Sequence, residues 1–443
     1  MLTHPIGGIV AFIAIMAGLF WSIFSLAQWP MDGIEWIFDV AGGVVRGLLP
    51  EGILQDFAVE GVIKGVGATV VFLPQICLLF FLISLLEDTG YLARAAFVVD
   101  RWLRPFGLPG HSFVPLLSSH ACALPGIMAC RGIPDRRERL ATILVAPFMT
   151  CSARLPVYAL LTGILFAESP SKATLAFIGC YALGLFAGVL SALVARRTIL
   201  RGKSRPMALE LPTYKRPSLR TALIATWDRA IVFVRKAGTN ILAICVILWW
   251  LGAYPKVEPP AEAMVLHQKV VDRMQAWTGR DEAPPQDVLR DVEAWQVQAQ
   301  RIEAAHAKKH SFIGQLGRIV EPVFRPIGCD WQLSIGVLTS FAAREVFGST
   351  MAVIVSGTED FEETSVRDAI ASAKREDGLT PVFTTATSWA LLVYYVLAMQ
   401  CLPTLAVTAK ETGSWKWALL QLAWMSALAY LAAALVYRVF GGA

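Results

Sequence analysis

The sequence is poor in charged residues. Asp, Glu, Lys and Arg together make up 16% of its 443 residues, whereas hydrophobic residues make up 56%. Soluble domains carry roughly 25% charged residues, so this composition excludes an ordinary water-soluble domain. It indicates a chain that lies largely within a membrane.

Two kinds of motif are also absent. No GxxxxGK[ST] loop exists to hold nucleotide phosphates, so the chain cannot hydrolyse GTP by that route. The eight cysteines form neither a CxxC pair nor a zinc-finger spacing, and nearly all lie in or beside apolar runs, which excludes a disulfide framework. Because no nucleophile–base pair is evident either, we expect a protein that is not an enzyme.

Long apolar runs dominate what is present. Several approach or exceed the roughly 20 residues that an α-helix needs to cross a bilayer. Eight predicted spans follow: Ile6–Ala27, Val66–Leu86, Leu140–Phe166, Ala173–Val194, Ala237–Tyr254, Trp331–Val355, Phe383–Val407 and Trp417–Val436. The predicted fold class is therefore an all-α polytopic membrane protein.

Basic residues set the predicted orientation. Residues 196–236 hold eleven Lys and Arg against two acids, and seven arginines lie between the second and third predicted spans. The positive-inside rule places both regions in the cytoplasm. Both termini then lie in the cytoplasm, and residues 254–331 lie outside. Between spans, such a basic stretch favours contact with anionic lipid over nucleic acid.

The predicted organisation is two membrane halves of opposite direction around a basic connector, the arrangement of inverted repeats. An N-terminal helix and amphipathic segment (1–64) precede the first half (65–196) and the connector (197–236). The second half comprises residues 237–254 and 313–443, and an extracytoplasmic helical hairpin (255–312) interrupts it. Within the first half, 87–106 is predicted as an amphipathic interfacial helix and 112–131 as a re-entrant hairpin.

The segment Ser118–Tyr158 carries the strongest chemical signal. His120, Cys122 and Cys151 are all potential metal ligands, and prolines and glycines interrupt the apolar helices around them. A backbone broken at membrane depth is tolerated where protein buries it or where it lines a cavity. This combination predicts a path for a metal that accepts soft ligands.

Several longer motifs resemble the membrane part, called the Gate domain, of the ferrous iron transport protein B family. These are LTHPIGG (2–8), GVGATVVFLPQICLLFFLISLLEDTGYLARAAFVVDR (65–101), APFMTCSARLPVY (146–158), ELPTYKRPSLR (210–220), FAAREV (341–346) and KETGSWKWAL (410–419). The resemblance covers nearly the whole chain. It implies a transporter in the bacterial inner membrane that takes up a divalent transition metal, with Fe²⁺ favoured.

The resemblance also implies ligands and shows departures. Cys401 in MQCLPT matches the family's Cys/Pro break in the penultimate span, and Cys122 and Cys151 occupy family motifs. The family's GFGCNVP-like motif is SSHACALP here, which keeps Cys122 but introduces His120. The family's AKE-type motif has become Ala-Arg-Glu at 343–345. The family's N-terminal GTPase domain is not found in this sequence.

Each candidate has a structural alternative. A cysteine on an apolar face is usually a small hydrophobic residue, and His120 is equally explained as a buried histidine bonded to a carbonyl. Intramembrane charges are costly, so Arg154, Arg344 and Glu345 are either functional or form an Arg154–Glu345 or Arg344–Glu345 pair. Glu87 and Asp88 either attract cations at the exit or end their helix. His306 and His310 share a helix face, as a metal-binding pair or a solvated helix end.

Three functional hypotheses remain open from the sequence. The first is metal transport, with no permanently bound cofactor and with ligation weak enough for release. The second is transport of another metal or an organic solute such as a nucleoside, and the third is a non-transporting sensor or assembly subunit. The predicted partners are the lipid bilayer, a separate cytoplasmic GTPase or small accessory protein, and a second copy of the chain.

Overall fold

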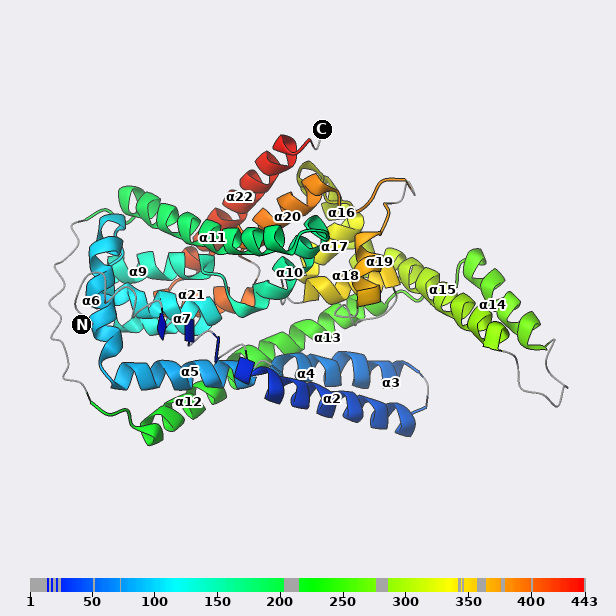
Figure 1. The fold of residues 1–443 in the computed structure, drawn as a ribbon, viewed down its shortest axis with the longest axis horizontal. Helices are drawn as coiled ribbons and strands as arrows, with labels where there is room; N and C mark the ends of the chain where they lie inside the picture. The colour runs from blue at the N-terminus through cyan, green and yellow to red at the C-terminus, as the bar shows by residue number, and fades with distance from the viewer. Residues whose placement is uncertain are drawn as a thin grey trace. The chain divides into compact units, whose positions relative to one another are not determined.

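The computed structural model describes residues 14–15, 17–18, 21–22, 25–50, 52–71, 73–202, 215–275, 286–341, 344, 346–356, 364–375, 379–399 and 401–441. These residues are almost entirely helical (Figure 1), and their only β-type pairing is an isolated bridge between Lys374 and Pro381. The all-α prediction is confirmed for this part of the chain.

The helices follow one another with short connections. Before the connector they are α2 (Gln28–Leu48), α3 (Ile53–Asp56), η1 (Phe57–Ile63), α4 (Lys64–Val70), α5 (Leu73–Asp88), α6 (Tyr91–Leu103), η2 (Arg104–Phe106), η3 (Gly110–Ser112), α7 (Phe113–Ala121), α8 (Ala123–Ala129), η4 (Cys130–Gly132), α9 (Arg136–Val145), η5 (Ala146–Phe148), η6 (Ser152–Arg154), α10 (Leu155–Leu165) and α11 (Pro170–Thr198). After it they are α12 (Leu219–Phe233), η7 (Val234–Gly238), α13 (Thr239–Ala253), α14 (Ala261–Gln275), α15 (Gln286–His310), α16 (Phe312–Phe324), η8 (Arg325–Ile327), α17 (Trp331–Thr339), α18 (Val346–Ser356), α19 (Thr364–Ala371), α20 (Thr385–Leu397), α21 (Leu402–Thr412) and α22 (Trp415–Val439).

The chain forms two compact units, each made of three separate segments. The first unit comprises Met1–Leu155, Leu175–Val246 and Tyr394–Ala429, and the second comprises Pro156–Thr174, Ile247–Val393 and Tyr430–Ala443. Long helices such as α20 and α22 therefore contribute to both units. Every predicted thiol ligand lies in the first unit.

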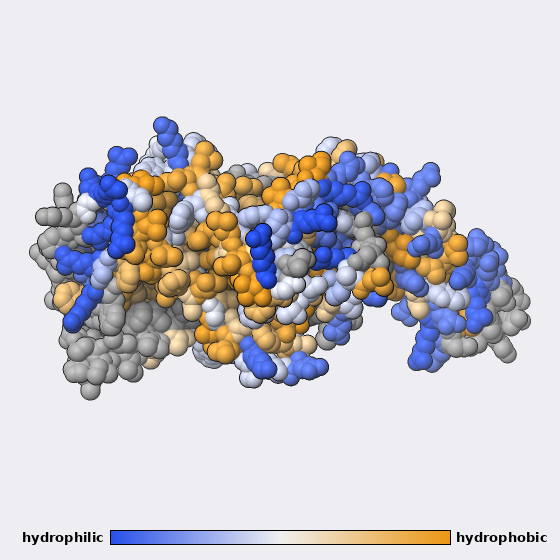
Figure 2. Space-filling model, turned by 90° about the horizontal axis from the view of Figure 1, so that it is seen from above, coloured by the Kyte–Doolittle hydropathy of each residue, from blue (hydrophilic) through white to orange (hydrophobic). Residues whose placement is uncertain are grey.

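Four stretches of the described residues are long and apolar enough to cross a membrane. They are Arg136–Leu165, Pro170–Thr198, Thr385–Thr412 and Trp415–Val439, and they correspond to four of the eight predicted spans. α11 also leaves apolar side chains exposed, including Leu175, Ile178 and Phe186. Figure 2 shows extensive hydrophobic surface of the kind that lipid would cover. The chain is thus a membrane protein.

The other predicted spans have different outcomes. Ile6–Ala27 lies largely outside the described residues, and Val66–Leu86 falls on α4 and α5. The span predicted at Trp331–Val355 is wrong as a single helix, because α17 and α18 fold back on each other. Thr339 Oγ1 lies 3.1 Å from Thr350 Oγ1, and a Cβ on Gly336 would lie 2.8 Å from the Phe347 ring.

α7 and α8 form the predicted hairpin at 112–131. A Cβ on Gly126 would lie 1.9 Å from Ser119 Oγ and 2.7 Å from the Pro115 carbonyl oxygen, so only glycine permits this close approach. Ser119 Oγ instead donates a 2.8 Å hydrogen bond to that carbonyl. The small residue therefore fixes how tightly the two short helices pack.

One local structure occurs twice in the chain. The tetrapeptides Arg104–Gly107 and Arg325–Gly328 each form a 3₁₀ turn after an amphipathic helix, and both glycines are left-handed, with φ of 85° and 84°. Leu108 N donates to the Leu103 carbonyl and Cys329 N to the Phe324 carbonyl, each at 3.3 Å. A helical hairpin, a broken helix and a long helix follow each turn. The same local turn therefore precedes a pair of packed short helices, α7 and α8 or α17 and α18, at both places.

A further helical hairpin, formed by α14 and α15, lies between α13 and α16 in the chain. Val270 packs against Val288, Val292 and Trp295 between the two helices. His267 Nε2 lies 2.9 Å from Glu303 Oε1, and Arg273 Nη2 lies 3.3 Å from Asp291 Oδ2. A small apolar seam and polar pairs therefore hold this hairpin together.

Candidate functional site

Cys122, Cys151 and Cys401 all lie at breaks between helices. Each has an extended backbone, with φ and ψ of −154° and 132°, −97° and 165°, and −155° and 98°, respectively. Prolines near these positions explain the breaks, because proline lacks the N–H that a continuing helix requires. Each thiol is half-buried and reduced, beside backbone groups that a regular helix would have paired.

Cys122 and Cys401 lie at the same end of a pair of packed helices. α8 begins directly after Cys122, α21 begins directly after Cys401, and the two helices pack against each other. At their other ends, Arg131 Nε and Nη2 donate to the two carboxylate oxygens of Glu411 at 2.6 and 2.5 Å. Because the carboxyl ends meet, the amino ends that carry the two thiols also lie on one side.

Arg154 joins the break at Cys151 to the break at Cys401. Its guanidinium is fully buried and donates hydrogen bonds to four backbone carbonyls. Nη1 bonds Phe148 at 3.3 Å and Val396 at 2.8 Å, and Nη2 bonds Pro147 at 2.9 Å and Ala398 at 3.2 Å. One side chain therefore satisfies the open carbonyls that precede both cysteines.

His120 reaches the same region from α7. Its half-buried imidazole lies within hydrogen-bonding reach of the backbone of Thr150, the residue before Cys151. α11 supports this loop from behind, since a Cβ on Gly184 would lie 2.9 Å from the Phe148 carbonyl oxygen and one on Gly188 3.0 Å from Met149. Small residues on α11 thus permit close packing of the broken backbone.

These ligands line a region of one unit without forming a closed metal site. Among the described residues, no three His, Cys, Asp or Glu side chains gather as a metal cluster. The arrangement offers separate thiols, one imidazole and exposed backbone groups.

A family model called Gate, described as nucleoside recognition, matches residues 69–165 and 234–415, which is more than half of the chain. The chain belongs to the Gate family. A second model, ferrous iron transport protein B C terminus, matches residues 177–229. The resemblance to the membrane part of the ferrous iron transport protein B family is thereby confirmed.

Curated relatives support the same assignment. The chain is 39% identical to the Fe(2+) transporter FeoB of Leptospira interrogans, over 99% of this chain and 59% of that protein. It is 36% identical to a FeoA/FeoB fusion protein of Porphyromonas gingivalis (99% and 51%) and 34% identical to FeoB of Campylobacter jejuni (98% and 63%). The chain thus spans about half to three-fifths of these relatives. No solved structure matches.

The predicted charges of this Gate chain fall in different places. Glu345, the candidate partner of both arginines, lies outside the described residues. Arg344 is buried in the connection between α17 and α18. Glu87 is exposed at the end of α5, while Asp88 Oδ2 accepts a 3.3 Å hydrogen bond from Ser218 N at the start of α12. Asp88 therefore ties the connector to α5.

Sequence reasoning missed how closely the two Gate breaks correspond. Met149-Thr-Cys151 and Met399-Gln-Cys401 share the pattern Met-x-Cys, and both methionines are buried. It also missed Thr150 and Thr404, which are 2% and 1% exposed and whose hydroxyl oxygens have no hydrogen-bond partner among the described residues. Threonine is not a soft ligand, so the search for thiols and imidazoles passed over it.

Proposed function

We propose that this chain transports a divalent transition metal, Fe²⁺ in the first place, through the first unit past Cys122, Cys151 and Cys401. The observation that carries this proposal is the Arg154 bridge between two corresponding Met-x-Cys breaks. The names of the relatives, Fe(2+) transporter FeoB, support the choice of ion.

Transport requires ligation that is weak enough for release. Fe²⁺ would lose part of its hydration shell and bind one or two thiols at a time, with waters and backbone carbonyls completing its coordination. His120 supplies an imidazole beside Cys151, and the hydroxyls of Thr150 and Thr404 offer harder oxygen ligands. This chemistry suits a borderline ion such as Fe²⁺. The ion is cargo, and no bound cofactor takes part.

The proposed setting is the bacterial inner membrane with two inverted Gate halves. Both α7–α8 and α17–α18 would be re-entrant hairpins, each following one copy of the Arg-Pro-x-Gly turn. Seven crossings then remain: the N-terminal span, α4–α5, α9–α10, α11, α13, α20–α21 and α22. The N-terminal span would start in the cytoplasm.

An odd number of crossings places the end of α22 outside, in place of the cytoplasmic C-terminus predicted from the sequence. Gln421 Nε2 near the start of α22 donates a 2.8 Å hydrogen bond to the carbonyl of Ile143 in α9, and Trp424 Nε1 a 3.0 Å bond to Ser191 Oγ in α11. Ser191 lies towards the arginine-bearing end of α11, and Ile143 lies four residues after Arg139 in α9. The 25 residues of α22 extend about 37 Å, enough to cross roughly 30 Å of hydrocarbon.

The chain itself would carry out no chemical reaction. The membrane potential favours cation entry by about 2.3 kcal/mol per charge per 100 mV, which is about 4.6 for Fe²⁺. A GTPase or accessory protein could add control by docking on the cytoplasmic side, where the basic connector and the Arg131–Glu411 pair lie.

Nucleoside transport is the second candidate, favoured by the description of the Gate model. A nucleoside has no need of thiols, so serine in place of Cys151 and Cys401 would leave its transport intact. Uptake of a radiolabelled nucleoside by the same protein distinguishes the two functions.

Anaerobic Fe²⁺ flux into proteoliposomes tests the metal proposal. We expect wild-type flux to fall at least tenfold in Cys151→Ser and Cys401→Ser, and to persist in the matched control Cys180→Ser, whose thiol is buried within the unbroken α11. Zn²⁺, Co²⁺ and Mn²⁺ measured in parallel rank the ions. Equal flux in all four proteins would remove the thiols from the path, and no flux in any folded protein would overturn autonomous transport.

A further inference from the structure

The α14–α15 hairpin carries a second group of potential ligands, His306 and His310, near the end of α15. They are four residues apart and so share one face of the helix. Their ring centres are 4.5 Å apart with the planes tilted by 47°. Both side chains are half-buried and reach solvent.

This separation fits two imidazoles on one ion. With metal–nitrogen bonds of about 2.1 Å, each ring centre would lie about 3.2 Å from the metal, and two rings at a right angle would have centres about 4.6 Å apart. The observed 4.5 Å is close to that value, so the spacing of the two rings is compatible with a shared divalent ion.

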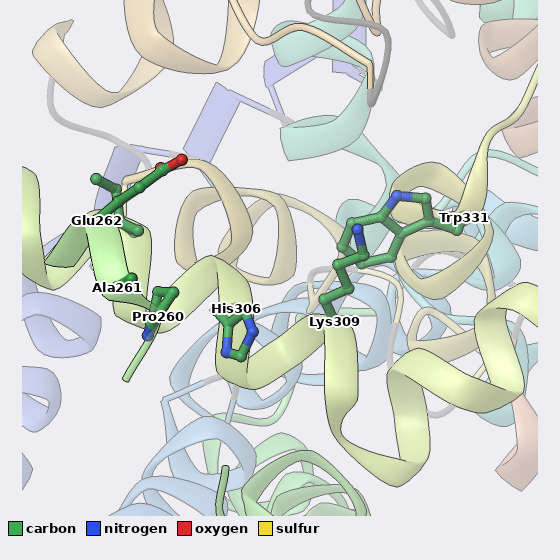
Figure 3. A pocket seen from close by; sticks show the side chains of 7 residues that line it. Pro260, Ala261, Glu262, His306, Lys309 and Trp331 are labelled. Carbon is green, nitrogen blue, oxygen red and sulfur yellow. The ribbon is translucent and has the colours of Figure 1, made fainter. Parts of the chain in front are cut away.

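The surroundings leave room for the rest of the coordination shell. His306 lines an open pocket of about 420 Å³ together with Glu262, Lys309, Ile302 and Trp331 (Figure 3). Waters can occupy this space, and Glu262 is among the residues that line it. Two histidines with several waters form a weak, open site.

The charges around the pair act in two directions. Burial, His306, Arg318 and Lys309 lower the pKa of His310. The same cations repel an arriving metal ion. The carboxyl end of α15 opposes that repulsion, because the partial negative charge of the helix dipole at a carboxyl end favours a positive charge. Glu262 adds a negative charge from α14.

We propose that His306 and His310 form a divalent-metal capture site on the outer hairpin. This inference rests on the proposed function, since the site would raise the local ion concentration before the ion enters the thiol path. Because it holds the ion through only two protein ligands, the site can release it. The two proposed sites differ in chemistry: the α14–α15 hairpin carries two imidazoles, whereas the proposed path through the first unit is formed mainly by thiols.

Ni²⁺ titration calorimetry of the full-length chain in detergent tests the site directly. All proteins would carry Cys122→Ser, Cys151→Ser and Cys401→Ser, so that thiols of the proposed path do not contribute. We expect one Ni²⁺ per chain at pH 7.5, bound at least tenfold more weakly after His306→Ala or His310→Ala. His267→Ala is the matched control on the same hairpin, because His267 pairs with Glu303.

A relocated pair separates ligation from folding. Adding Ile302→His to His310→Ala restores the spacing of four residues with His306 and should recover Ni²⁺ binding. Unchanged binding in both single alanine variants, or equal loss in His267→Ala, would overturn the proposal.

Fe²⁺ flux in the background with intact cysteines distinguishes the site from the path. The alanine variants should raise the Fe²⁺ concentration for half-maximal flux several-fold without lowering the maximal rate. Thiol variants should lower the maximal rate instead. If the thiol variants keep the wild-type maximal flux, the proposed function is contradicted. The Ni²⁺ titration still tests the histidine site independently of that result.

Discussion

The guanidinium Nη1 of Arg154 donates a 2.8 Å hydrogen bond to the carbonyl oxygen of Val396, 242 residues further along the chain. Val396 belongs to the last turn of α20, just before the break that carries Cys401. Because the other bonds of Arg154 hold the carbonyls before Cys151, this one residue sets two broken backbones against each other. An arginine that looks like an ion-pair candidate in the sequence acts here on the backbone.

Replacing Arg154 should therefore destabilise the first unit. Arg154→Ala leaves buried carbonyls without donors, and losing hydrogen bonds to a charged group costs about 1.5–3 kcal/mol each. We expect a loss of several kcal/mol, seen as a lower unfolding temperature in detergent. Arg154→Lys should recover only part of it, since an ammonium lacks the planar fork. Arg137→Ala, at an exposed arginine bonded to the Arg201 carbonyl, should change little. Equal losses of stability in Arg154→Ala and Arg137→Ala would contradict the Arg154 bridge.

Gly126 allows a test of how closely α7 and α8 pack in their hairpin. A methyl group there would collide with Ser119 and the Pro115 carbonyl, so Gly126→Ala should separate α7 from α8 and cost about 1–3 kcal/mol. Gly163→Ala, in helix α10 with nothing within 4 Å, is the control and should be neutral or stabilising by up to about 1 kcal/mol. Thermal unfolding of both variants checks this. A stable, fully active Gly126→Ala would show that the helices do not pack this closely.

Much of this architecture could be predicted from sequence because apolar length and proline position are local signals. These signals predict two hairpins, α14–α15 and α7–α8. They also predict the helix breaks at Cys122, Cys151 and Cys401. The contacts of Arg154 could not be predicted, because its partners are backbone carbonyls far along the chain and leave no trace in side-chain identity.

The prediction of a single span at Trp331–Val355 was wrong for a different reason. Its residues are as apolar as those of a true span, so composition alone gives one helix from Trp331 to Val355. The repeated tetrapeptides at Arg104–Gly107 and Arg325–Gly328 were the available signal. Matching them would have aligned α17 and α18 with the α7–α8 hairpin and shown that both are hairpins.

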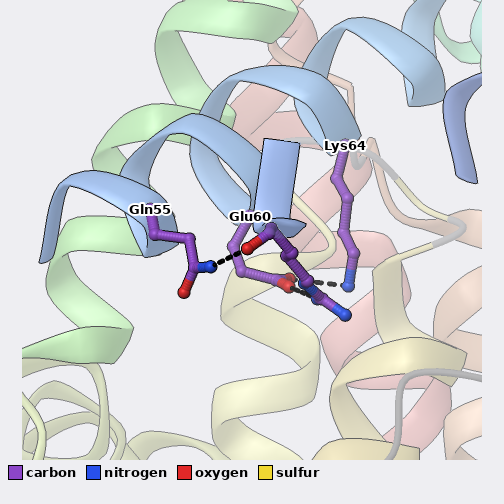
Figure 4. A network of polar contacts seen from close by, with 4 residues as sticks. Gln55, Glu60 and Lys64 are labelled. Carbon is purple, nitrogen blue, oxygen red and sulfur yellow. Dashed lines mark hydrogen bonds and ion pairs between the residues drawn. The ribbon is translucent and has the colours of Figure 1, made fainter. Parts of the chain in front are cut away.

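Lowering the pH should remove a small contribution of Glu60 to the free energy of unfolding. Glu60 lies outside the predicted spans. Its carboxylate bonds Arg46 Nη2 and Lys64 Nζ, each at 2.6 Å (Figure 4). Burial raises the pKa of Glu60, but Lys64 and Arg46 outweigh it and hold the pKa below its ordinary value. The contribution is therefore fully present above about pH 4.3 and is lost as the pH falls through the folded pKa.

Glu60→Gln should accordingly cost up to about 1 kcal/mol at pH 7, as expected for a partly exposed ion pair. The difference in unfolding temperature from wild type should shrink between pH 5 and pH 3. Asp56→Asn, nearby and exposed, serves as a comparison. A difference for Glu60→Gln that grows on acidification would contradict the assigned direction of the pKa shift.

The proposed direction of α20–α21 can be tested with cysteines placed on either side of the membrane. Lys416 is exposed at the start of α22, and Glu258 is exposed between α13 and α14. Because Glu411 pairs with Arg131, which lies in the arginine-bearing region between the second and third predicted spans, Lys416 should face the cytoplasm. In intact spheroplasts, a membrane-impermeant maleimide should label Glu258→Cys and leave Lys416→Cys unlabelled until the membrane is permeabilised. Labelling of Lys416→Cys from outside would restore the eight-span topology with a cytoplasmic C-terminus.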